Sequence, residues 1–228
     1  MIVTAVVCPH PPLLLRELSG AADAAPELRA ACHEALASAL ELQPDVVVVV
    51  GGADESGEWD PLLPVDVHRF GTSDAPHVAG LPLSLGVASR LLHEVGWAGP
   101  TRTHAIAWDA GPAEVGERAQ EVAAVEGRVM LVVMGDGSAR RGEKAPGHLD
   151  ERAFAFDDEV GRALEEGDAA TLSALDPVLA RELMASGRAA HAVLGRAVAA
   201  QGARPRAKTL YCDDPYGVMY HVAVWDLS

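Results

Sequence analysis

The feature that most constrains the fold of this chain is residues 45–50, where Asp45 is followed by an unbroken run of valine. A strand without a polar face cannot lie half-exposed, so this one is expected in the middle of a sheet that is covered on both sides. Residues 2–7 and 128–134 have the same apolar character. Helical patterns separate these three segments, which predicts an α/β fold.

Proline and aspartate mark where several helices are expected to begin. Pro26 and Pro112 stand where proline is favoured, in the first turn of a helix. Asp150 and Asp176 are suited to cap two more helices. The predicted helices cover residues 26–42, 83–95, 112–125, 150–166, a segment that starts at 176, and 188–201.

A hairpin is expected near the end of the sequence. Residues 208–212 and 218–225 are predicted strands, joined by the turn sequence Asp-Asp-Pro-Tyr-Gly over residues 213–217. An antiparallel hairpin makes a mixed sheet more plausible than an all-parallel one. Two shorter strands are predicted over residues 65–70 and 104–108.

The sequence shows no internal repeat, no low-complexity linker and no break in composition, so residues 1–228 are predicted to form one domain. That length is enough to bury a substantial core. Apolar residues make up 49% of the chain but aromatic residues only 4%, which suits tightly packed α/β layers better than a β-sandwich. The predicted fold is a single-domain, three-layer α/β/α sandwich around a mixed, mostly parallel sheet.

The charge and the cysteines limit the partners and the compartment. The formal net charge is −15, which argues against nucleic acid and against an anionic membrane surface as partners. No apolar run approaches membrane-spanning length, and the sequence opens directly into a strand without a basic leader. The cysteines Cys8, Cys32 and Cys212 lack metal-finger spacing and are expected to be reduced thiols. The protein is therefore expected to be cytoplasmic.

Polar residues follow three of the apolar strands. His10 lies in the rigid turn Cys-Pro-His-Pro-Pro after the first strand, Asp54 follows the valine strand, and Asp136 follows residues 128–134. Ligand sites of α/β folds form at the carboxyl ends of strands, so these three side chains are expected around one pocket. An imidazole and two carboxylates are compatible with a divalent Fe, Mn or Zn ion. In the alternative interpretation, both aspartates cap helices or bind turn amides.

Other motifs give weaker indications of a functional site. Ser138 follows Asp136 in the same strand exit, and His148 lies in a glycine- and proline-containing loop that is a candidate lid. Cys8 fits a small buried apolar residue better than a ligand. The sequence has neither a G-x-S-x-G nucleophile elbow nor a phosphate-binding P-loop.

Four short motifs, in this order and spacing, resemble one known family. They are Cys8-Pro9-His10-Pro11-Pro12, Gly135-Asp136-Gly137-Ser138, Ala145-Pro146-Gly147 and Phe156-Asp157. Together they resemble the class III extradiol dioxygenase superfamily, which includes the LigB ring-cleaving subunits and the Memo-like proteins. The resemblance implies an α/β/α sandwich, and it makes a homodimer plausible. In active members it implies Fe(II) held by two histidines and a carboxylate, which opens a catechol ring with O2.

The resemblance also implies that the iron site is degraded. His10 matches the first metal-binding histidine of the family. Ala53 stands at the expected second histidine, and Ala139 stands where the Gly-Asp-x-Ser-His motif has its acid–base histidine. Ser186, before Gly187-Arg188, takes the place of a cysteine found in Memo-like members. We therefore expect no standard iron site of two histidines and one carboxylate around His10.

Two functional hypotheses remain open at this point. In the first, the protein is a LigB-like relative that does not cleave catechols but binds a small aromatic or other small molecule, or a partner. In the second, it is an active metal-dependent oxygenase or hydrolase in which His10, Asp54 and Asp136 hold the metal and His148 assists. The candidate ligand-binding residues are His10, Asp54, Asp136, Ser138 and Ser186.

Overall fold

The structure is a computed structural model, and it describes residues 1–19, 23–67, 70 and 80–228. In these residues the chain forms one seven-stranded sheet in the order β3-β4-β2-β5-β1-β7-β6. The neighbours β4, β2, β5 and β1 are parallel, and the pairs at either end of the sheet are antiparallel. The strands are β1 (Ile2–Cys8), β2 (Val46–Ala53), β3 (Gly57–Trp59), β4 (Thr101–Ala107), β5 (Val129–Met134), β6 (Arg206–Asp213) and β7 (Tyr220–Asp226).

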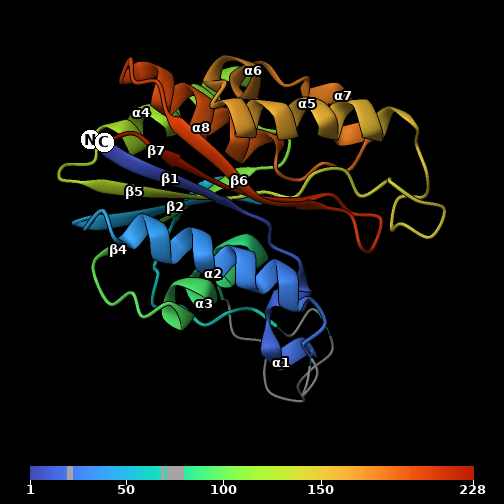
Figure 1. Ribbon diagram of the computed structural model, residues 1–228, viewed down its shortest axis with the longest axis horizontal. Helices are drawn as coiled ribbons and strands as arrows, with labels where there is room; N and C mark the ends of the chain where they lie inside the picture. Colours follow the sequence, from blue (N-terminus) through green and yellow to red (C-terminus); the bar gives the residue numbers. More distant parts are fainter. Residues whose placement is uncertain (20–22, 68–69, 71–79) are drawn as a thin grey trace.

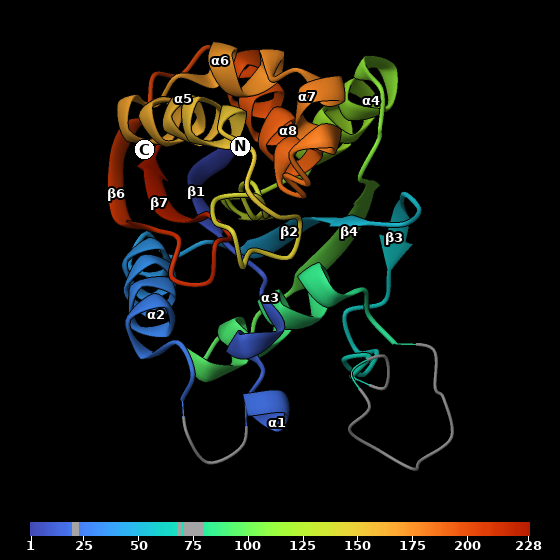
Figure 2. The same ribbon diagram turned by 90° about the vertical axis from the view of Figure 1, so that its right-hand side faces the viewer.

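Helices cover both faces of this sheet (Figure 1). The layer above the sheet in that view consists of α4 (Pro112–Ala123), α5 (Arg152–Glu166), α6 (Ala169–Ala174), α7 (Pro177–Glu182) and α8 (Arg188–Ala200). The layer below consists of η1 (Pro12–Leu14), α1 (Arg16–Ser19), α2 (Pro26–Leu40) and α3 (Leu83–Glu94). Figure 2 shows the same two layers from a second side. The predicted single three-layer α/β domain with a mixed sheet is confirmed.

The valine strand explains why both faces need cover. Every residue of β2 is buried. Val48 and Val50 belong to the core under α4, α5 and α8, while Val47 and Val49 belong to the core under α2 and α3. Because successive side chains of a strand point to opposite faces, an all-valine strand supplies both cores at once.

Two short elements differ from the prediction. Residues 65–70 do not form a strand in the part that is described: Val65 makes a single parallel bridge with Leu81, and residues 68–69 lie outside the described residues. β3 was not predicted, because its Gly-Glu-Trp sequence is short and has no apolar alternation. The predicted hairpin of β6 and β7 is confirmed, and Gly217 takes the positive φ of 70° that its turn requires.

Among the described residues, no helix has both the length and the apolar character needed to cross a membrane. The part of the fold that matters for function is the edge where the four parallel strands end. His10, Asp54, Trp108 and Asp136 follow β1, β2, β4 and β5 there.

Candidate functional site

His10 and Asp136 are in direct contact at this edge. The strands β1 and β5 are neighbours that end in register, with Cys8 opposite Met134, so the residues that follow them meet. The His10 backbone N–H donates to Oδ1 of Asp136 over 2.7 Å, and the His10 Nδ1 atom lies 3.5 Å from the same oxygen. Burial raises the pKa of Asp136, and the nearby His10 opposes that shift. Of the three residues expected around one pocket, His10, Asp54 and Asp136, the structure brings His10 and Asp136 into direct contact.

Trp108 covers His10. Its indole stacks on the imidazole with ring centroids 5.8 Å apart and an interplanar angle of 22°. The indole also lies against Gly52, where any Cβ atom would overlap its six-membered ring. Its Nε1 donates to Oδ1 of Asp54 over 3.2 Å. Sequence reasoning missed Trp108, although its position directly after β4, at a carboxyl strand end, was a signal that could have found it.

Two cavities flank the indole. The larger, of about 490 Å³, is lined by Asp54, Trp108, Asp109, Ala180, Arg181, Met184, Ala185 and Ser186. A second cavity of about 360 Å³ also has Asp54 and Trp108 in its lining, together with Ala53 and Trp59. Of the residues predicted to bind a ligand, Asp54 and Ser186 thus share one cavity. His10 and Asp136 adjoin it through the stacked Trp108 ring.

A buried arginine fixes the backbone of Trp108. Arg188 is 5% exposed and begins α8, two residues after Ser186. Its Nη2 donates to the carbonyl oxygens of Trp108 and Ala110, over 3.2 and 2.8 Å. The Trp108 N–H donates to the carbonyl of Ala53 at the end of β2. The main chain of Trp108 is therefore held from two sides.

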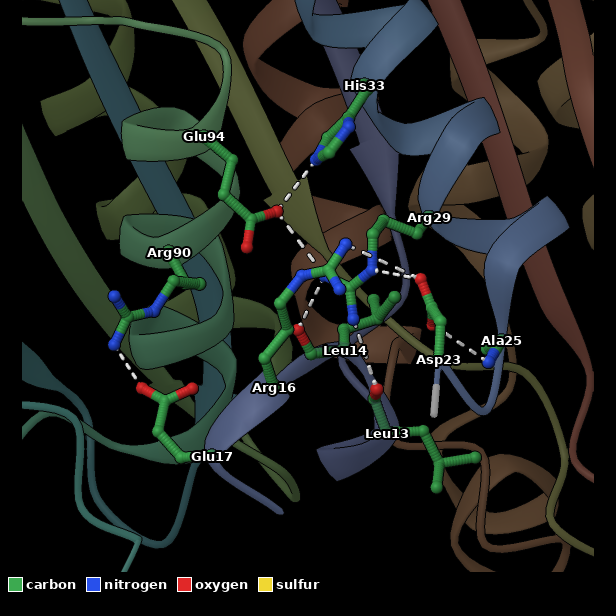
Figure 3. Close-up of polar contacts among 10 residues, drawn as sticks. All are labelled: Leu13, Leu14, Arg16, Glu17, Asp23, Ala25, Arg29, His33, Arg90 and Glu94. Carbon is green, nitrogen blue, oxygen red and sulfur yellow. Dashed lines mark hydrogen bonds and ion pairs between the residues drawn. The ribbon is translucent and has the colours of Figure 1, made fainter. Parts of the chain in front are cut away.

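A second arginine, Arg29, holds the backbone that follows the proline turn of His10 (Figure 3). Arg29, on α2, donates to the carbonyl oxygens of Leu13 and Leu14, over 3.4 and 2.9 Å, just after the proline turn. The same guanidinium pairs with Asp23 and Glu94. These contacts join η1, α2 and α3 and hold the chain directly after the His10 turn.

Two further histidines lie buried behind this edge and were not predicted as site residues. His191, on α8, packs against Gly135 and Gly187, where a Cβ atom would lie 2.8 Å from its ring. Burial, followed by the nearby His221 and His10, lowers the pKa of His191 to about 3. Burial and the charge of Arg141 lower the pKa of His221 to about 4. Both histidines are thus neutral in the folded protein at pH 7.

Two predicted residues have other roles. Ser138 is fully buried; its hydroxyl donates to the Leu183 carbonyl over 2.7 Å and its N–H donates to Asp157. It therefore holds its loop in place instead of facing a cavity. His148 is exposed, and its Nδ1 lies 3.4 Å from the carbonyl of Glu143 in the same loop. Among the described contacts, none joins His148 to His10.

The arrangement does not fit the iron centre that the family resemblance implies. Within the described ranges, no three His, Cys, Asp or Glu side chains are arranged to hold a metal ion. His10 and Asp136 adjoin, but Asp54 is connected to them only through Trp108, whose ring covers the imidazole. The three predicted ligands are thus not brought together as one set.

The fold and this edge define a class of protein: a three-layer α/β domain with a cleft at the carboxyl ends of its parallel strands. No family model matches the sequence, and no curated protein matches it significantly. Among solved structures, the chain is similar to the crystal structure of the uncharacterized protein JW3007 from Escherichia coli K12. The TM-score is 0.52 at 18% identity, over 98% of this chain and 99% of that one. At this identity the similarity shows the fold alone.

Proposed function

We propose that this chain is a LigB-like relative of the class III extradiol dioxygenases that binds a small organic molecule in the cleft beside Trp108 and does not cleave catechol rings. The observation that carries the proposal is the 490 Å³ cavity, which brings Asp54 and Ser186 together beside the Trp108 ring that stacks on His10. A concave site with apolar walls and a few convergent polar groups is the usual form of a small-molecule site.

The lining suits a ligand with a flat body and a polar edge. Trp108 supplies an aromatic plane, Ala185 and Met184 supply apolar surface, and Asp54 and Ser186 supply hydrogen-bonding groups. Aromatic rings stack favourably at such a surface by about 0.5–1.5 kcal/mol beyond the area that they bury. The cleft therefore has the chemistry to bind and orient a small aromatic molecule.

Two features argue against ring cleavage. Ala53 and Ala139 cannot ligate a metal or transfer a proton, and the first of them ends β2 beside the cleft. Loss of a general acid–base group costs about 10²–10⁴-fold in rate. A single imidazole is also a poor anchor for divalent iron, which is retained by several rigidly held ligands.

The first test is catalytic. Protocatechuate and catechol are incubated with the protein and added Fe(II) under oxygen, and the yellow ring-fission product is followed by absorbance. We expect no turnover by the unmodified protein. We also expect none by Ala139→His alone, because the position of Ala53 still lacks its imidazole. Clear turnover by the unmodified protein would contradict the proposal and favour the alternative, an active metal-dependent enzyme that uses His10 with nearby carboxylates.

The second test is binding. Catechol is titrated to about 5 mM, the range of weak ligands, into ¹⁵N-labelled protein without added metal. The indole N–H signal of Trp108, assigned from its loss in Trp108→Phe, should shift. The internal control is the indole N–H signal of Trp97, which should not shift. This N–H group donates to Thr101 at the other end of β4. A Ser186→Phe variant, which fills the cavity, should abolish the shift. No shift in the unmodified protein would contradict binding at this cleft.

A further inference from the structure

The indole of Trp108 lies in a niche with three defined sides. The imidazole of His10 forms a parallel stacking surface, and Gly52 forms a wall that has room for a flat ring only because it lacks a Cβ atom. The carboxylate of Asp54 accepts a hydrogen bond from the edge of the ring. These are the three things that a protein offers to a planar aromatic ligand: a stacking partner, a narrow slot and one polar anchor.

The side chain is held less firmly than its backbone. The main-chain N–H and carbonyl of Trp108 are bonded to Ala53 and Arg188. Trp108 is 38% exposed, and among the described residues its indole makes one polar contact, a 3.2 Å bond to Asp54, which is also exposed. Exposed side chains change rotamer within nanoseconds. The ring can therefore turn while the main chain stays in place.

There is also space to receive the turned ring. Trp108 is in the lining of both cavities, of about 490 and 360 Å³, so empty space adjoins the indole on two sides. The position that it leaves exposes the ring face of His10, which is otherwise 3% exposed, while Nδ1 stays beside Asp136.

We infer that Trp108 is an internal occupant of the ligand site: the ligand is a planar heteroaromatic molecule with an N–H donor on its edge, and it displaces the Trp108 indole from between His10 and Gly52. This inference rests on the proposed function and moves the ligand from the face of Trp108 into the position that its ring occupies. The Asp54 carboxylate selects a hydrogen-bond donor at the edge of the ring. An internal competitor also lowers apparent affinity, by the fraction of time that the niche is open.

The experiment uses indole as the probe and calorimetry as the readout. Trp108→Ala removes the competitor and should bind indole at least about tenfold more tightly than the unmodified protein does. Trp108→Phe keeps a ring but loses the bond to Asp54, so it should show an intermediate affinity. The matched control is Trp97→Ala, which truncates a tryptophan that lines a different cavity of about 510 Å³. It should bind indole no better than the unmodified protein.

The donor is tested with 1-methylindole, which has the same ring but no N–H group. Trp108→Ala should prefer indole over 1-methylindole by about 2- to 10-fold, the value of one typical hydrogen bond. Adding Asp54→Asn should remove most of this preference. Equal affinities in Trp108→Ala would contradict the role of Asp54 as the anchor.

Displacement is tested in the unmodified protein. Millimolar indole should shift both the Trp108 indole N–H signal and the His10 ring signals in NMR spectra. One combination of results would contradict the inference alone. Catechol shifts the Trp108 signal, but neither catechol nor indole shifts the His10 ring signals. In addition, Trp108→Ala still unfolds cooperatively but binds indole no better than Trp97→Ala does. Trp108 is then a fixed wall: the inference fails while the proposed function stands. If neither probe perturbs Trp108, both fail.

Discussion

At the scale of single residues, Arg29 influences the candidate site without touching it. Its side chain is 4% exposed and satisfies two backbone carbonyls of the segment that follows His10. It also lies between the carboxylates of Asp23 and Glu94 (Figure 3). Removing it leaves two backbone carbonyls without their donor, while Asp23 keeps Arg16 and Glu94 keeps His33 as partners.

We therefore predict that Arg29→Met lowers the free energy of unfolding by about 1–3 kcal/mol, the cost of leaving buried hydrogen-bonding groups unsatisfied. The matched control is Arg90→Met, since Arg90 pairs with Glu17 in the same region but is partly exposed. It should cost less than about 1 kcal/mol. Urea unfolding at pH 7 measures both values. Equal losses in the two variants would show that the burial of Arg29 is unimportant.

The residue scale also shows how far the site could be predicted. His10 and Asp136 were predicted together because neighbouring parallel strands deliver their carboxyl ends to one edge. Ser138 was misjudged, since a serine in such an exit can bond inward to a carbonyl as well as outward to a ligand. Trp108 was missed because one aromatic residue after a strand has no periodic signature.

At the scale of secondary-structure elements, two helical glycines should respond oppositely to alanine. On α8, a Cβ atom at Gly195 would overlap the carbonyl oxygen of Ala169 and lie 2.9 Å from the amide nitrogen of Ser173, both backbone atoms of α6. On α4, a Cβ atom at Gly116 would meet only the guanidinium end of Arg196, at 3.0 Å. Backbone atoms cannot move aside, whereas a flexible side chain can.

We predict that Gly116→Ala raises the free energy of unfolding by about 0.5–1 kcal/mol, the gain in helix propensity. Gly195→Ala should lower it by about 1–3 kcal/mol, because overpacking against α6 outweighs that gain. Chemical denaturation with both variants in one buffer provides the comparison. A stabilising Gly195→Ala would mean that α6 and α8 are not in close contact.

The helices and strands were largely predictable from the sequence, and the elements that were not predicted are short. Central strands and proline-initiated helices were found because burial imposes a pattern over many residues. β3 escaped because a three-residue edge strand is defined by its pairing with β4 rather than by its own sequence. α6, with six residues between α5 and α7, is too short for its apolar period to be visible.

At the scale of the whole molecule, the buried histidines make stability depend on pH. The folded protein keeps His221 neutral down to about pH 4, whereas in the unfolded chain its pKa returns to about 6.5. Below pH 6.5 the unfolded state binds a proton that the folded state excludes, so stability falls as the pH falls. His191 acts in the same direction.

We predict that His221→Leu reduces the loss of stability between pH 7 and pH 5 by about 2 kcal/mol. Neither ring nitrogen of His221 has a hydrogen-bond partner, so the leucine breaks no such bond. Asp157 works the other way, since burial raises its pKa to about 6 and acid then favours the folded state. That contribution is common to both proteins and cancels in the difference. Identical pH profiles from urea titrations would exclude His221 as a source of acid sensitivity.

The position of β1 has a consequence for how the molecule is made. One neighbour of β1 is β7, and Thr4 is 221 residues away from its partner Trp225. While the protein is being synthesised, β1 can pair with β5 on one side. Its other side stays unpaired until the hairpin of β6 and β7 has left the ribosome. Its fully buried sequence then presents an open edge, the kind of surface that nascent chains use to aggregate. Lower expression temperature, which weakens hydrophobic association, should therefore increase the yield of soluble recombinant protein.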